Sequence, residues 1–434
     1  MKYLGQALLG AGMPLLLLIT GLYFALVLGK YMLRAPRKCF SALHRGGGER
    51  GSSARALAVA LAGTLGVGNI AGVAAAIAAG GAGAVFWMLL AAFVAMPLKY
   101  AEITLSQVYR SYDAEGRPHG GAPYYIKAVL GGRLGWIMSV LFALLLVFCT
   151  LTLGSLLQSR AAAEAVSGVF GVPEAAVGTV LALLAALVLL SGSELAERVL
   201  SVLVPFLCVG FTVAAVALLI LRRAALPAAF AAIWQGAFTP KAGVGGVLGI
   251  CTSRALRLGV ARGLVSNEAG CGTAPTAHAA ANAKIPAAQG LWGILEVFVD
   301  TVLLCTLTAL VILVTAGENA GAGVMLAISA FGAGLGPCLP PLIALSVFLF
   351  AFATVLCWTH YGIEALAYLT GSARGKRLLI LAACLTTALG AVTAPTLVWG
   401  ATDLVLALMT LLNLAVLLVA HPTILSETRR LFLS

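Results

Sequence analysis

The chain has 434 residues, of which 61% are hydrophobic and only 10% are charged, and its mean hydropathy is +1.05. A soluble globular chain carries about one quarter charged residues, so this composition excludes a soluble fold and indicates an integral membrane protein. The net charge of +12 does not indicate nucleic-acid binding, because many of the basic residues lie in one loop beside an apolar run.

Apolar runs long enough to cross a membrane recur along nearly the whole chain. A helix needs about 20 mainly apolar residues to span the hydrocarbon, and no run shows the period-two alternation of a β-barrel strand. We therefore predict an all-α polytopic membrane protein with about eleven transmembrane helices. The predicted spans are residues 11–33, 56–80, 84–108, 134–153, 174–191, 199–221, 234–265, 288–315, 340–370, 378–397 and 402–420.

The first apolar run, Ala7–Val27, predicts a retained helix. It is longer than the hydrophobic part of a signal peptide and no convincing cleavage site follows it. The next loop is basic, and cytoplasmic loops carry the excess of lysine and arginine, so we expect this loop inside and the N-terminus outside. The basic residues of the loop are Arg34, Arg37, Lys38, Arg45, Arg50 and Arg55.

Two glycine-rich segments interrupt predicted helices. "GTLGVGNIAG" (Gly63–Gly72) lies in the second span and "KAGVGGVLG" (Lys241–Gly249) in the seventh. One such segment usually serves close helix packing, but breaks at corresponding positions of two halves indicate an inverted-repeat transporter with a midplane site. We predict one membrane domain, residues 1–434. Its parts are a peripheral first helix and basic loop (1–54), two five-helix repeats (55–223 and 231–420) and a tail (421–434).

An unwound backbone inside the membrane predicts a kind of ligand. Its unpaired N–H and C=O groups are tolerated only where they line a cavity within the protein. The half-helix after the break directs its positive end at that cavity and suits a carboxylate, while the carbonyls before the break suit Na⁺ or an ammonium group. A small zwitterion satisfies both ends, and glycine leaves room for it.

Four blocks of this chain resemble the alanine or glycine:cation symporter family, in the same order over residues 55 to 420. They are "GTLGVGNIAGVAAAIAAGGAGAVFWM" (Gly63–Met88), "RLGVARGLVSNEAGCGTAP" (Arg257–Pro275), "EVFVDTVLLCTLTALVIL" (Glu296–Leu313) and "FAFATVLCWTHYG" (Phe350–Gly362). The resemblance implies a sodium:amino-acid symporter with a leucine-transporter-like 5+5 inverted repeat and broken helices 2 and 7.

The resemblance also implies a substrate site. Gln158 matches a family glutamine that faces the site, although by itself it could equally cap the fourth span at the membrane interface. Trp358 resembles the family tryptophan that closes the pocket; its position well inside the ninth span disfavours an interfacial role. The substrate-binding residues that we expect are Thr64, Gly66, Val67, Gly68, Asn69, Gln158, Gly245, Gly246 and Trp358.

Thr354 is the residue that we expect to bind the cation. It lies one helical turn before Trp358, so both side chains can face one cavity. By the family pattern, its hydroxyl and the carbonyls of Ala62, Leu65 and Phe350 would form an oxygen site for Na⁺, although membrane threonines more often bond to their own helix. No cofactor other than this coupling ion is expected.

The chain departs from the family pattern near Thr354. Ala353 stands where a serine is usual, which removes one hydroxyl from the cation site, so proton coupling or uncoupled transport remains an alternative. Cys357 and His360 replace a glycine and a tyrosine of the family. These departures leave the specificity of the pocket open.

Polar residues elsewhere in the spans are expected to gate or support the site: Lys99, Glu102, Ser266, Asn267, Glu268 and Asp300. Lys99 and Glu102 would form a gating or anchoring pair, or an ordinary snorkelling pair. Glu296 and Asp300 have i, i+4 spacing and could hold a divalent ion for an intramembrane transferase, but such a site needs a second acidic cluster. A channel is disfavoured because no filter or ring of charges repeats.

We therefore predict a secondary active transporter and not an enzyme. It would import a small neutral amino acid, alanine or glycine, with Na⁺ by alternating access. Its partners would be the amino acid, the cation and the lipid bilayer of a prokaryotic inner membrane, with no nucleic acid.

Overall fold

The structure is a computed structural model that describes residues 12–44, 48–238, 254–315 and 323–433. Helices make up nearly all of these ranges, and the strands found within them form one short antiparallel hairpin, β1 (Ser111–Tyr112) and β2 (Pro118–His119). The predicted all-α class is therefore confirmed.

The first half of the chain contains the following elements. They are α2 (Met13–Val27), α3 (Gly29–Met32), α4 (Ala35–His44), α5 (Gly48–Thr64), η2 (Gly68–Gly72), α6 (Val73–Gly80), α7 (Gly83–Val108), α8 (Ala122–Leu130), α9 (Gly132–Leu151), η3 (Thr152–Leu157), α10 (Gln158–Phe170), α11 (Glu174–Leu190) and α12 (Ser193–Leu221).

The second half begins with a short 3₁₀ turn. Its elements are η4 (Arg223–Ala225), α13 (Leu226–Phe238), α15 (Arg254–Asn267), α16 (Pro275–Ala279), α17 (Pro286–Val297), η5 (Phe298–Cys305), α18 (Thr306–Val314), α19 (Gly323–Leu335), α20 (Leu339–Thr370), α21 (Ala373–Gly390), α22 (Pro395–Val419) and α23 (His421–Leu433).

Several of these elements can cross a membrane. Six helices in the described ranges are long and apolar enough, and the bent pair Gly51–Thr64 and Gly68–Gly80 makes a seventh span. Shorter apolar helices, including α2 and α11, occupy further predicted spans. These elements are compatible with about eleven spans. The 13-residue α19 lies in none of the predicted spans, because it is too short to produce a spanning hydropathy signal.

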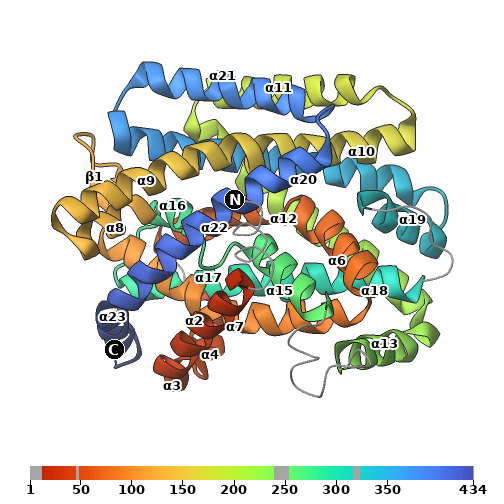
Figure 1. Ribbon diagram of the computed structural model, residues 1–434, viewed down its shortest axis with the longest axis horizontal. Helices are drawn as coiled ribbons and strands as arrows, with labels where there is room; N and C mark the ends of the chain where they lie inside the picture. The colour runs from red at the N-terminus through yellow and green to blue at the C-terminus, as the bar shows by residue number, and fades with distance from the viewer. Residues whose placement is uncertain (1–11, 45–47, 239–253, 316–322, 434) are drawn as a thin grey trace.

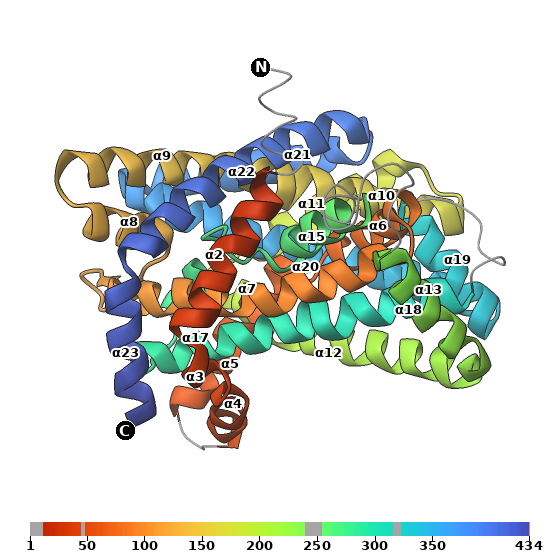
Figure 2. The same cartoon turned by 60° about the horizontal axis from the view of Figure 1, so that its bottom comes forward.

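The helices pack in layers around α7 and α20. α7 contacts α15 and α17, and α20 contacts α9 and α10. α11 and α21 lie side by side along one edge of the molecule (Figure 1), while α2 crosses over α7 on another face (Figure 2). The outer face of α12 carries Val202, Phe206, Val209 and Val213, all between 61% and 72% exposed, as expected where a helix faces lipid.

Two helices are broken near the centre of the molecule. α5 ends at Thr64 and η2 begins at Gly68, with a bend of 52° between the two half-helices. α15 ends at Asn267, and α16 begins only at Pro275. The predicted broken helices 2 and 7 are thus confirmed as a feature of the fold.

The described part of the seventh helix is interrupted after α15. The segment Lys241–Gly249, with the predicted residues Gly245 and Gly246, lies outside the described residues. In the described chain the seventh helix is interrupted within the Ser-Asn-Glu-Ala-Gly block, where Gly270 and Gly272 have φ of 83° and 76°. The repeat boundaries at 55–223 and 231–420 stay a prediction.

Candidate functional site

Polar side chains accept hydrogen bonds from the backbone N–H groups at the first break. The N–H of Gly66 donates to Asn69 Oδ1, and the N–H of Val67 donates to Gln158 Oε1, each at 3.3 Å. Gln158 is buried and its amide also donates to the carbonyl of Leu153. Gln158 therefore faces the break rather than capping its helix at the membrane surface.

One face of α20 contacts the carbonyl groups at the end of α5, just before the break. Thr354 Oγ1 lies 2.9 Å from the carbonyl oxygens of Ala62 and Phe350 and 3.5 Å from that of Leu65. The structure thus brings together all four members of the predicted cation site. Their role as Na⁺ ligands stays a prediction.

Two further residues on α20 extend this contact. Trp358 Nε1 donates to the carbonyl of Gly63 at 3.3 Å, and Trp358 is fully buried, so it is not an interfacial belt residue. Cys357 donates its thiol to the carbonyl of Val59 at 3.0 Å. Residues 354, 357 and 358 lie on one helix face by their spacing.

The space beside the first break is small. A Cβ added at Gly66 would lie 2.8 Å from Gln158 Oε1 and from Thr354 Oγ1, which is closer than real side chains approach. The adjoining cavity measures about 10 Å³ and is lined by Leu65, Gly66, Asn69, Ile70, Phe211, Leu304 and Phe350. Such a cavity holds about one water molecule, so an amino acid requires the surrounding helices to move.

A second polar cluster joins the two broken helices. The Asp300 carboxylate accepts hydrogen bonds from Asn69 Nδ2 at 2.7 Å, Ser266 Oγ at 2.9 Å and Thr301 Oγ1 at 2.6 Å. Asn267 donates in turn to Thr301 at 3.3 Å. All of these residues are buried, so the cluster fixes η2 against α15 and η5.

The residues of the site lie at three π-helical turns. Asn69 is in η2, Asp300 is in η5, and Gln158 follows η3 directly. Each π-helical turn leaves backbone groups outside the regular α-helical ladder, and such turns are frequent at functional sites. Gly68, the first residue of η2, packs against α15: a Cβ there would be 3.4 Å from the Cα of Ser266. Thr64 has only long contacts, with the carbonyls of Ala60 and Leu61 in its own helix.

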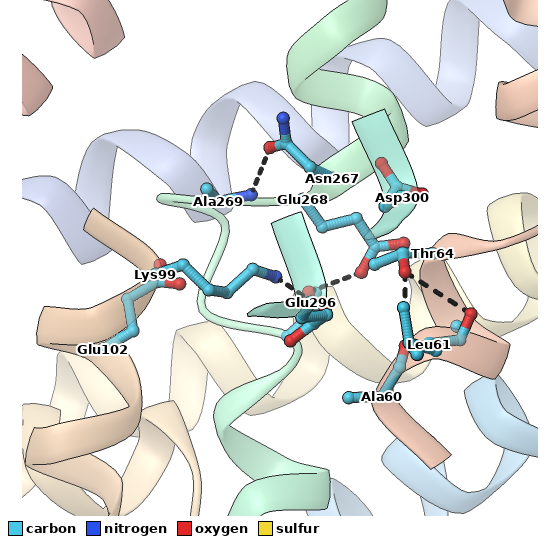
Figure 3. Close-up of polar contacts among 12 residues, drawn as sticks. Ala60, Leu61, Thr64, Lys99, Glu102, Asn267, Glu268, Ala269, Glu296 and Asp300 are labelled. Atoms are coloured by element: carbon cyan, nitrogen blue, oxygen red, sulfur yellow. Dashed lines mark hydrogen bonds and ion pairs between the residues drawn. The ribbon is translucent and has the colours of Figure 1, made fainter. Parts of the chain in front are cut away.

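A buried charged cluster lies beside the second break. Lys99 Nζ is 3.2 Å from Glu296 Oε1 and points at it in Figure 3, and Glu296 Oε2 is 3.2 Å from His278 Nε2. Glu102 accepts hydrogen bonds from the N–H of Gly272 and from Asn413 Nδ2. Side chains from α7, α16, α17 and α22 therefore meet the irregular segment after α15.

This geometry corrects two sequence-based interpretations. Lys99 does not form its ion pair with Glu102, and both side chains are fully buried, which excludes a snorkelling pair. Glu296 and Asp300 do not share one site, because they bond to separate partners. In the described part of the chain no group of three or more His, Cys, Asp or Glu side chains is placed to hold a metal ion.

Sequence reasoning missed the partners of these acids. His278, Gln289 and Asn413 complete the buried network but carry no motif, and Asn413 is 311 positions from its partner Glu102. Their polarity was the one signal that could have identified them. Burying a polar residue in a membrane helix costs free energy, so such residues are candidates for a functional role.

The two broken helices, with a central polar site between them, define a multi-pass membrane transporter with a leucine-transporter-like fold. A solved structure described as MhsT in complex with L-phenylalanine has the same fold, with a TM-score of 0.57 at 14% identity over 86% of this chain and 91% of that chain.

A family model described as the sodium:alanine symporter family matches residues 1–432. The chain belongs to this family. It is 36% identical to a Methanococcus maripaludis protein named sodium/alanine symporter AgcS, over 97% of this chain and 94% of that protein. It is also 37% identical to an uncharacterized transporter of Haemophilus influenzae, over 97% and 93% of the two chains. Because the family and the fold are those of transporters, the protein is not an enzyme.

Proposed function

We propose that the protein imports a small neutral amino acid, alanine or glycine, together with Na⁺ by alternating access. The observation that carries this proposal is the oxygen set around Thr354. One hydroxyl and the carbonyls of Ala62, Leu65 and Phe350 converge where the second span is broken. A hard monovalent cation prefers oxygen ligands, and carbonyls freed from a helix supply them.

The neighbouring residues support a zwitterionic substrate. Asn69 and Gln158 hold the N–H groups of Gly66 and Val67, which are the groups that would face a substrate carboxylate. An ammonium group would be bound by freed carbonyls on the other side of the break. The proposed substrate ligands remain Thr64, Gly66, Val67, Gly68, Asn69, Gln158 and Trp358, with Gly245 and Gly246 outside the described residues.

The size of the site supports a small side chain. Trp358 packs closely against η3: a Cβ added at Gly154 would lie 2.3 Å from the Cβ of Trp358. The indole therefore cannot retreat in that direction to enlarge the pocket. The named function of the Methanococcus maripaludis relative agrees with this choice of alanine.

Uptake by the purified protein in liposomes tests the proposal. Labelled alanine and labelled glycine are supplied with an inward Na⁺ gradient, with a proton gradient alone, and with neither. We expect accumulation only with the Na⁺ gradient. Accumulation with the proton gradient alone would favour the proton-coupled alternative, and equilibration without a gradient would favour a facilitator or channel.

Substitution of Thr354 tests the cation site itself. Thr354→Ala removes the hydroxyl, so the Na⁺ concentration needed for half-maximal uptake should rise, while Thr354→Ser keeps the hydroxyl and should restore a value near that of the wild type. An unchanged Na⁺ dependence in Thr354→Ala would remove Thr354 from the site.

We also propose the orientation of the protein in the membrane. The basic first loop would lie in the cytoplasm of a prokaryotic cell and the N-terminus outside, in the plasma membrane. Accessibility of a single cysteine introduced near the N-terminus to a membrane-impermeant thiol reagent, in a variant without the native cysteines, would test this orientation.

A further inference from the structure

A cavity of about 190 Å³ lies between α2, α15 and α22, apart from the first break. Its lining includes the side chains of Leu17, Arg262, Glu268, Asp403 and Thr410. Most of the lining is apolar, but Arg262, Glu268, Asp403 and Thr410 supply polar groups, and the volume has room for several water molecules. It therefore brings water-accessible space up to the second break, where Glu268 lies.

Glu268 is held at this position by an unusual backbone conformation. Its φ is 53°, and no other non-glycine residue in the described ranges has a positive φ. Left-handed backbone is unfavourable for a residue with a long side chain and persists where the surrounding structure enforces it. The side chain is 2% exposed, and its carboxylate accepts a hydrogen bond from Thr273 Oγ1 at 2.6 Å.

The charges around Glu268 do not balance. Lys99 lies within electrostatic reach of the carboxylates of Glu296, Glu102 and Glu268, and all four side chains are buried. Figure 3 shows Lys99 and Glu268 on either side of Glu296 in this view. Lys99 and, when protonated, His278 supply at most two positive charges for three buried carboxylates. At least one carboxylate is left uncompensated, and an uncompensated buried charge is costly enough that the group takes up a proton instead.

Several charged side chains in the same cluster have buried atoms without a hydrogen-bond partner. Within the described chain, Lys99 Nζ, Glu102 Oε2 and Glu296 Oε1 are buried and have no hydrogen bond of good geometry. Lys99 and Glu296 remain close enough for an ion pair at 3.2 Å. Glu102 Oε1 already accepts two hydrogen bonds. Glu268 differs from these acids because it also lines the cavity.

The cluster continues from Glu296 to the inner half of the first broken helix. Glu296 contacts His278, whose Nδ1 is 2.8 Å from Gln289 Nε2, and Ser53 Oγ on α5 donates to Gln289 Oε1 at 2.7 Å. All of these side chains are buried. A change of charge near Glu268 is thereby connected through polar contacts to α5, which carries the carbonyls of the proposed cation site.

We propose that Glu268 is a proton-binding site that exchanges its proton with water in the cavity during the transport cycle. A hydronium ion in the cavity gives a proton to the carboxylate, leaving a neutral carboxylic acid and a water molecule, and the reverse step releases the proton. The acid is neutral when the cluster is closed and ionises when water reaches it. This inference rests on the proposed transport function and adds a proton to its cycle.

Other ionisable groups on the surrounding elements also influence this exchange, and the test must separate them from Glu268. They are Lys99 and Glu102 on α7, Cys149 on α9, Arg262 on α15, Cys271 after it, His278 on α16, Glu296 on α17, Asp300 on η5, Cys357 and Tyr361 on α20, and Asp403 on α22.

Infrared difference spectroscopy of the full-length protein between acidic and alkaline pH tests the proton site without any need for transport. We expect a carboxylic-acid carbonyl band that is lost in Glu268→Gln and shifted in Glu268→Asp. Glu164→Gln, which alters a half-buried glutamate on α10, is the matched control and should keep the band. Wild-type bands in Glu268→Gln would overturn the proposal. Glu268→Asp keeps the test valid if the glutamine variant does not fold.

A second measurement connects the site to transport. Proteoliposomes containing a pH-sensitive dye should show an internal pH change when alanine is added to the wild type and to Glu164→Gln, and none with Glu268→Gln, although that variant still exchanges labelled for unlabelled alanine. If the wild type takes up alanine and moves no protons, the proton proposal fails and the transport proposal stands. If the wild type takes up no alanine but the infrared band still depends on Glu268, the transport proposal fails and the proton-site proposal stands.

Discussion

Substitution of Gly66 by alanine should both destabilise the protein and stop transport. The added methyl carbon would lie 2.8 Å from Gln158 Oε1 and from Thr354 Oγ1, so both polar atoms must move. Overpacking of this kind costs about 1–3 kcal/mol. Displacing Gln158 also removes its hydrogen bond from the N–H of Val67, which is worth about 1 kcal/mol. We therefore expect the free energy of unfolding to fall by about 2–4 kcal/mol.

The assay combines thermal unfolding of the purified protein with alanine uptake in liposomes. Gly210→Ala is the matched control, because this glycine lies inside α12 and a Cβ there meets nothing within 4 Å. In that variant stability should be unchanged or should rise by up to about 1 kcal/mol, since alanine is the better helix former. Wild-type stability and wild-type uptake in Gly66→Ala would refute the idea that Gln158 and Thr354 leave no room at residue 66.

Two further predictions concern charged groups outside the first break. The pKa of His119 is raised from 6.5 to about 9, chiefly by its hydrogen bond with Glu364 at 2.7 Å, with a further contribution from Asp113. The stability that this contact gives to the β1–β2 hairpin is thus complete below pH 6.5 and lost as the pH rises through about 9. Hydrogen exchange in residues 109–121, corrected for the intrinsic pH dependence, should increase over that interval, and His119→Gln should abolish the increase; a pH-independent exchange pattern in the wild type would contradict it. Lys99→Met leaves Glu296 without its buried cation and should cost about 3–5 kcal/mol of unfolding free energy. The double variant Lys99→Met/Glu296→Gln should recover part of that loss in thermal unfolding, and no recovery would show that the two residues are not coupled.

The membrane class and the first break could be predicted from the sequence because each depends on local properties. Apolar runs determine which segments span the bilayer, and the Gly66–Gly68 triplet lies at the break itself. The grouping of Thr354 with Ala62 was expected only from the family resemblance. No local pattern specifies that contact, because the two residues are 292 positions apart.

The interruption after Asn267 was not predicted from the sequence, because no glycine triplet marks it; the predicted break at Lys241–Gly249 lies outside the described residues. In the described chain the interruption includes Gly270 and Gly272 at positive φ, two glycines that Cys271 separates. Helical spacing misled in a different way at Glu296 and Asp300. The π-helical η5 begins at Phe298, between the two acids, so the regular i, i+4 geometry does not hold and they contact different partners.

The hydroxyl group of Thr354 lies within hydrogen-bond distance of two carbonyl oxygens, and it can donate a full hydrogen bond to only one of them. Thr354 Oγ1 carries a single hydrogen and lies 2.9 Å from both Ala62 and Phe350, so it can donate fully to only one of them at a time. When it donates to Phe350, on its own helix, the lone pairs of the oxygen are free to face the break. A cation could then bind only after the hydroxyl has rotated about the Cβ–Oγ1 bond of Thr354. The free energy of that rotation would contribute directly to the affinity of the site for the cation.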